Sequence, residues 1–210
     1  MPCCRKILNA LFLSTFLLLA SSLAWATDIS IREPRLQSHE EGYTLAADFN
    51  INFNPRLEEA VNKGIILYFL VDFELTRARW YWLDEQVVHR SKTFQLSYHA
   101  LTRQYRLSTG ALHQSYASLD NVLRVLSRLR GWQVLEKNEF KIDQNYLAGV
   151  QMRLDLTQMP KTFQVNALSN KDWNLSSGWA RWNFTPVETP AAPNNPDTLA
   201  PATPLSDENK

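Results

Sequence analysis

The chain has 210 residues, 45% of them hydrophobic and 20% charged, which is the composition of a globular protein with a sizeable core. Its 22 basic and 21 acidic side chains give a formal net charge of +1, and this balance argues against a nucleic-acid-binding protein. Both cysteines, Cys3 and Cys4, lie near the N-terminus. A chain that loses its first residues would therefore have no disulfide, thiolate nucleophile or Cys-ligated metal.

The first 26 residues have the three parts of a secretory signal peptide. Arg5 and Lys6 precede an apolar run over residues 7–20, and a stretch of small residues then ends at Ala26. The apolar run is shorter than the ~20 residues of a transmembrane helix. We therefore predict cleavage after Ala26 and a periplasmic protein of a Gram-negative bacterium with no transmembrane span after cleavage. An uncleaved N-terminal anchor is the alternative.

The first half of the mature chain predicts strands and one short helix. Residues 43–53 alternate between apolar and mostly polar side chains, as a half-buried strand does. A helix over residues 55–62 follows, because Asn54 can cap it and a proline begins it. Residues 65–74 are apolar on both faces over most of their length, which indicates a strand inside a sheet. Residues 79–83 are predicted to be its neighbour.

The middle of the chain predicts two further strands and a longer amphipathic helix. The strands are expected at residues 87–98 and 103–108. Ser118 can cap the helix, which is predicted to extend to Gly131 with its arginines on the opposite face. The apolar stripe expected to cover the sheet consists of Leu119, Val122, Leu123, Leu126 and Leu129.

The last part of the chain predicts three more strands and a tail. The strands are expected at residues 132–135, 146–156 and 179–184, and residues 163–168 fit either a helical turn or a strand. Residues 187–210 are rich in proline and alanine with little to bury, so a disordered tail is predicted.

These elements do not alternate regularly between strand and helix. The predicted fold is therefore mainly β, an antiparallel β-sandwich or strongly curved sheet with two short helices, in a single domain over residues 27–186. Charge is uneven along this domain: residues 28–76 hold four basic and nine acidic side chains, and residues 77–130 hold nine basic and three acidic ones. Such asymmetry marks either a partner surface or two segments that face and neutralise each other.

No motif for catalysis, a cofactor or a metal is present in the sequence. The four histidines show no metal-ligand spacing, and there is no nucleophile elbow, phosphate loop or dinucleotide fingerprint. We therefore predict no catalytic residues, no cofactor and no metal site. A catalytic group assembled from distant Ser, His and Asp residues stays an alternative, because such sites are defined by geometry.

Arginines and aromatic residues lie side by side in several stretches. Exposed Trp, Tyr and Arg are the residue types that anchor interfaces. If Trp80 and Trp82 point inward, alternation along a strand directs Arg79 and Tyr81 outward. The alternative is a structural ladder in which arginines stack on rings. The predicted binding residues are Arg77, Arg79, Tyr81, His99, Arg103, Tyr105, Arg106 and Trp173.

Six short runs carry a family resemblance, at residues 54–60, 73–77, 79–82, 98–106, 163–168 and 173–175. With these runs the chain resembles the DUF4390 family, exported proteobacterial proteins of unknown function that are sometimes labelled proline-rich. The likeness covers roughly residues 29–186. The resemblance implies no catalytic residue, and it associates the chain with genes that lie near an envelope-sensing two-component system.

The sequence thus predicts a non-enzymatic, periplasmic interaction domain, an accessory to envelope sensing that presents an arginine and aromatic surface to an envelope protein. A glycan- or lipid-binding module with an aromatic platform is the first alternative. A hydrolase of unknown class is the second, and it would need a Ser or Asp with a His in hydrogen-bond reach.

Overall fold

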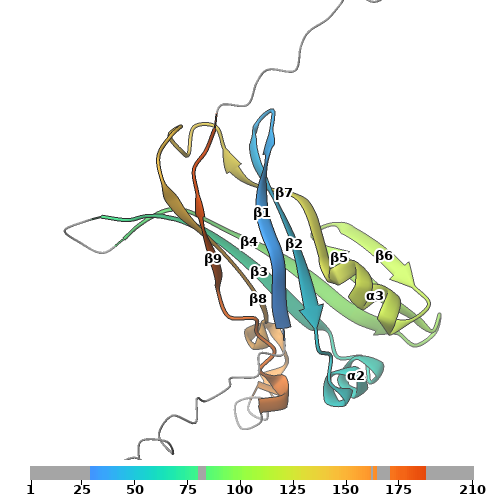
Figure 1. Ribbon diagram of the computed structural model, residues 1–210. Coiled ribbons are helices and arrows are strands. Elements are labelled where there is room, and N and C mark those ends of the chain that lie inside the picture. Colours follow the sequence, from blue (N-terminus) through green and yellow to red (C-terminus); the bar gives the residue numbers. More distant parts are fainter. Residues whose placement is uncertain (1–28, 80–83, 162, 165–170, 188–210) are drawn as a thin grey trace, which may run out of the picture.

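The computed structural model describes residues 29–79, 84–161, 163–164 and 171–187 (Figure 1). The predicted signal peptide and nearly all of the predicted tail lie outside the described residues. So do residues 80–83, which carry the strand predicted at 79–83, and most of the ambiguous stretch at 163–168.

The described residues form two antiparallel sheets. The small sheet has the order β1-β2-β7, with β1 (Ile29–His39), β2 (Gly42–Ile51) and β7 (Arg128–Glu136). The large sheet has the order β6-β5-β4-β3-β8-β9, with β3 (Leu67–Arg77), β4 (Glu85–His99), β5 (Gln104–Thr109), β6 (Leu112–Tyr116), β8 (Tyr146–Leu154) and β9 (Ala180–Phe184). Figure 1 shows the small sheet lying across the large one. The predicted mainly β class with two short helices is confirmed.

The hydrophobic core lies between the two sheets. One face of β3 is completely buried, and alternate residues of β2 are buried in the same cluster. The core residues of these two strands are Leu67, Phe69, Val71, Phe73 and Leu75 of β3, with Tyr43, Leu45, Ala47 and Phe49 of β2. Because β3 pairs with β4 on one side and β8 on the other, its predicted place inside a sheet is confirmed.

Two α-helices connect the sheets. In α2 (Pro55–Asn62) the side chain of Asn54 caps the first turn, as predicted, by accepting from the Leu57 N–H at 3.0 Å. In α3 (Leu119–Leu126) the Ser118 hydroxyl caps the first turn by accepting from the Asn121 N–H at 3.3 Å. Two short 3₁₀ turns, η1 (Leu156–Gln158) and η2 (Lys171–Trp173), lie between β8 and β9.

The predicted extension of the α3 helix to Gly131 is wrong. The helix ends at Leu126, and Leu129 belongs to β7, where it pairs with Ala47 of β2. The Phe49 N–H also donates to the Ser127 carbonyl at 2.8 Å. Main-chain pairing with β2 therefore overrides the helical spacing of the leucines, because local propensity is a weak preference beside tertiary contacts.

Two strands were not predicted, β1 and β6. Most of β1 is exposed, and its alternation is broken by a bulge between Arg32 and Arg35, where Glu33 has a φ of 46°. In β6 four of the five residues are exposed, so its sequence does not show the alternation of apolar and polar residues that a half-buried strand has. Both strands are specified by the neighbour with which they pair.

Candidate functional site

Two of the predicted binding arginines are paired within the domain. Arg77 ends β3, Arg79 follows it, and both hold the carboxylate of Glu85 at the start of β4. Nη2 of Arg79 lies 2.7 Å from Oε2 of Glu85, and Arg77 donates to the same oxygen. The hydrogen bond from Arg79 lowers the pKa of Glu85 most, and the hydrogen bond from Arg77 lowers it further, so this pKa lies below its ordinary value. Tyr81 lies outside the described residues.

Four other predicted binding residues lie at the opposite end of β4. His99 ends this strand, Arg103 lies in the following turn, and Tyr105 and Arg106 belong to β5. Because β4 has 15 residues, its two ends are about 45 Å apart. The structure therefore does not bring Arg79 and Arg103 onto one shared face.

Tyr105 and Trp173, the tyrosine and tryptophan of the predicted set that the structure describes, make contacts within the domain. The hydroxyl of Tyr105 donates to Oδ1 of Asn62 in α2 at 2.6 Å, its ring lies 4.9 Å from that of Tyr98, and burial raises its pKa. Trp173 is only 8% exposed, and its ring centroid lies 6.3 Å from that of Phe163. Trp173 is thus part of the core.

One arginine lies over an aromatic ring near β9, as in the arrangement considered from the sequence. The guanidinium of Arg181 lies 5.2 Å from the ring centroid of Trp179 and donates to Oε1 of Glu74 at 2.9 Å. A Cβ on Gly149 would lie 3.2 Å from Cε3 of Trp179, a tight contact, so a side chain at this position would require the ring to shift by a few tenths of an ångström. These contacts join β3, β8 and β9 on the outer face of the large sheet.

A Ser, a His and an Asp also meet on this outer face, but their hydrogen bonds do not form a catalytic triad. The Ser91 hydroxyl donates to Oδ1 of Asp72 at 2.6 Å and lies 3.3 Å from Nε2 of His89. The same Nε2 lies 3.9 Å from Asp72, so the carboxylate does not orient the other ring nitrogen. A triad needs the hydroxyl to donate to the imidazole and the carboxylate to bind its far nitrogen. Within the described residues no group of His, Asp and Glu side chains could hold a metal ion.

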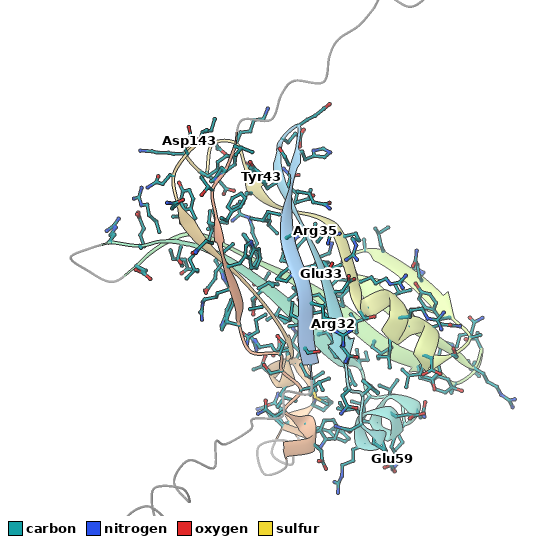
Figure 2. The ribbon with its side chains drawn as sticks, in the orientation of Figure 1. Arg32, Glu33, Arg35, Tyr43, Glu59 and Asp143 are labelled. Carbon is teal, nitrogen blue, oxygen red and sulfur yellow. The ribbon has the colours of Figure 1, made fainter. Side chains whose placement is uncertain are left out.

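The small sheet carries an open hollow of about 790 Å³ on the side where its strands bulge. In β1 an extra residue lies between Arg32 and Arg35, and in β7 an extra residue lies between Leu129 and Trp132. Figure 2 labels Arg32 and Arg35 along β1. Bulges re-aim side chains at the edges of sheets. The lining residues are Arg32, Glu33, Asp48, Phe49, Asn50, Ser127, Arg128 and Arg130.

Asp48 lies at the centre of this basic hollow. Its Cα neighbours across the sheet are Arg32 of β1 and Arg128 of β7. Its carboxylate is bound by Arg130, whose Nη2 lies 2.6 Å from Oδ1 and whose Nη1 donates to the Ala47 carbonyl at 2.9 Å. Because Phe49 points into the core, Asp48 and its two cross-strand neighbours point outward.

Arg32 and Arg128 have no ion pair or hydrogen bond with any side chain among the described residues, and both are exposed. Glu33, the other acid of the lining, pairs with Arg35 at 3.4 Å. The hollow therefore has two guanidinium groups free to bind a carboxylate or phosphate, for which the planar donor fork of arginine is suited.

Sequence reasoning did not find this hollow, although the uneven charge pointed to it. The segment with excess acid supplies Asp48 and Arg32, and the segment with excess base supplies Arg128 and Arg130. Among the described residues, Arg130 and Asp48 form the only arginine–carboxylate pair between these two segments. Mutual neutralisation of the segments is thus slight.

The fold and the hollow together define a two-sheet β domain with a basic surface site. A family model described as "Domain of unknown function (DUF4390)" matches residues 26–183, so the chain belongs to this family and the predicted resemblance is confirmed. No curated protein and no solved structure matches the chain. Across the described residues, no helix has both the length and the apolar character needed to cross a membrane.

Proposed function

We propose that this protein is an exported, non-enzymatic interaction domain of the cell envelope, and that it binds an acidic segment of a partner protein in the basic hollow. Export is predicted by the signal peptide that ends at Ala26.

The observation that carries the proposal is the pair of unpaired arginines on opposite edges of one small sheet. Arg32 and Arg128 flank an aspartate that Arg130 already neutralises, so the domain itself does not use their charge. Arg77 and Arg79 differ in this respect, because both pair with Glu85 within the domain. Arginine is among the residue types that contribute most to binding at interfaces.

The proposal is tested by comparing two double variants in binding to envelope proteins. Arg32→Ala with Arg128→Ala removes two unpaired arginines, and Arg77→Ala with Arg79→Ala removes two paired ones, so both change the charge equally. Each tagged full-length protein is used to recover proteins from detergent-solubilised envelopes at low salt. The first double variant should recover a specific partner about tenfold less well than the wild type, with a nearly unchanged melting temperature. The second should bind as the wild type does.

Equal recovery by the wild type and the Arg32/Arg128 variant would contradict the proposal. Loss of binding in the Arg77/Arg79 variant alone would also contradict the proposal, because it would place the binding site where β3 turns into β4. Because charged contacts are screened, binding should also weaken as the salt concentration rises from about 0.05 to 0.5 M.

A further inference from the structure

The free edge of β6 lacks the features that protect the other sheet edges. β1 has Pro34, a bulge and charged residues, β7 has a bulge beside Arg130, and β9, the other edge of the large sheet, contains Arg181. β6 pairs with β5 in an unbroken register and contains no charged residue and no proline. Its first residue, Leu112, is 79% exposed. Exposed edges without charge, proline or bulge are templates for another strand.

The turn before β6 determines which backbone groups this edge presents. β5 and β6 are joined by Gly110 and Ala111, with a φ of 57° at the glycine, and Thr109 pairs with Leu112. A two-residue hairpin turn of this kind closes on a hydrogen-bonded pair. Alternate residues of β6 therefore bond to β5. His113 and Ser115 direct their N–H and C=O groups outward, and no described residue pairs with that edge.

We propose that β6 pairs with β6 of a second copy of this chain, antiparallel and centred on Gln114. In this register Gln114 lies opposite the partner's Gln114 as a non-hydrogen-bonded pair. His113 and the partner's Ser115 exchange main-chain hydrogen bonds on each side of it. Leu112 lies opposite the partner's Tyr116, which covers its exposed side chain. Apolar–aromatic cross-strand pairs of this kind stabilise sheets, and no like charges face each other.

The basic residues near β6 do not prevent this pairing. Arg106 of β5 is the nearest of them, because it pairs with Ser115 of β6. Three strand spacings separate it from the partner's Arg106, about 15 Å. This exceeds the Debye length of about 8 Å at physiological ionic strength, so their repulsion is largely screened. The pairing is isologous, with the same strand used by both copies, and it leaves the basic hollow of the small sheet outside the contact.

A cysteine at the centre of the proposed pair tests the register directly. In the full chain with Cys3→Ser and Cys4→Ser, Gln114→Cys places two sulfur atoms across a non-hydrogen-bonded pair, where Cα atoms are about 4.5 Å apart and a disulfide can form. Gln133→Cys, on the exposed edge strand β7, is the matched control. Mild oxidation should convert the Gln114→Cys protein to a covalent dimer about tenfold faster than the control.

A charge exchange at the same position provides a second test. Gln114→Glu and Gln114→Lys should each self-associate about fivefold more weakly than the wild type, because like charges then meet at the two-fold axis. A mixture of the two variants should regain dimer, which sedimentation equilibrium at about 0.1 mM protein would show. The proposal is overturned if the wild type is monomeric at that concentration, if the cysteine control cross-links equally fast, or if the mixture shows no recovery.

Discussion

At the scale of single residues, Asp155 is a carboxylate that stabilises the turn after β8 through its charge. It caps η1, where its oxygens accept from the Thr157 N–H at 3.1 Å, the Thr157 hydroxyl at 2.6 Å and Nε2 of Gln158 at 2.8 Å. Burial would raise its pKa, but these hydrogen bonds outweigh burial and hold the pKa of Asp155 below its ordinary value.

The lowered pKa predicts a pH-dependent contribution from Asp155. Its pKa in the unfolded chain is about 3.9, and the folded value is lower, so its stabilisation is complete above that pH and is lost as the pH falls through the folded pKa. Asp155→Asn should therefore be less stable than the wild type by about 1–2 kcal/mol at pH 6. The difference should narrow toward pH 3. Urea unfolding at both pH values measures it, and a difference that stays constant would contradict this assignment.

At the same scale, the sequence identified the residue types at interfaces but not their partners. Arg77 and Arg79 were predicted as binding residues, yet Glu85, at the start of the next strand, pairs with both. That contact depends on where β3 turns into β4, which alternation alone does not specify. Trp173 was predicted as a binding residue and packs in the core, because a tryptophan in a polar loop has no periodicity to indicate its direction.

At the scale of elements, the close contact between β2 and β7 depends on Gly42. This residue follows the β1–β2 turn with a φ of 144°, and a Cβ there would lie 2.0 Å from the Leu135 carbonyl oxygen. Gly42→Ala should therefore destabilise the domain by about 2 kcal/mol or more, since β7 would have to move. The control is Gly110→Ala, where the φ is 57° and no atom lies within 4 Å.

Gly110→Ala should lower the free energy of unfolding only by the backbone strain of a residue with a side chain at this φ, about 1 kcal/mol. Thermal melts of the two variants compare these effects. If the Gly42→Ala protein were as stable as the Gly110→Ala protein, β7 would be able to move away from β2 at little cost. The close contact between Gly42 and Leu135 would then contribute little to the stability of the small sheet.

The elements that the sequence predicted best are those with a buried face. The apolar β3 and the capped α2 were expected within a few residues of their observed limits, because burial and capping leave a local pattern. By contrast, β1 and β6 are mostly exposed, and α3 ends earlier than expected because β2 pairs with the following residues. The sandwich-like class followed from the many short strands, whereas the strand order depends on long-range pairing.

At the scale of the whole molecule, the basic hollow is a product of topology. Its arginines are far apart in the sequence and are brought together only because β1 and β7 flank β2. Since β1 was not predicted and the first part of β7 was assigned to a helix, no sequence pattern could place Arg32 beside Arg128. The uneven charge along the chain was the one available signal, and its cause became visible only with the strand order.

The central claim is that the basic hollow binds an acidic partner in the envelope, and cross-linking in living cells tests it most directly. A photoreactive phenylalanine is placed at Asn50, which is exposed and lines the hollow, or at Gln95, which is exposed on β4. On illumination, the Asn50 probe should give one discrete adduct with another envelope protein. That adduct should disappear with Arg32→Ala and Arg128→Ala, and the Gln95 probe should give none. An adduct that persists without the two arginines, or that forms equally from Gln95, would contradict the claim.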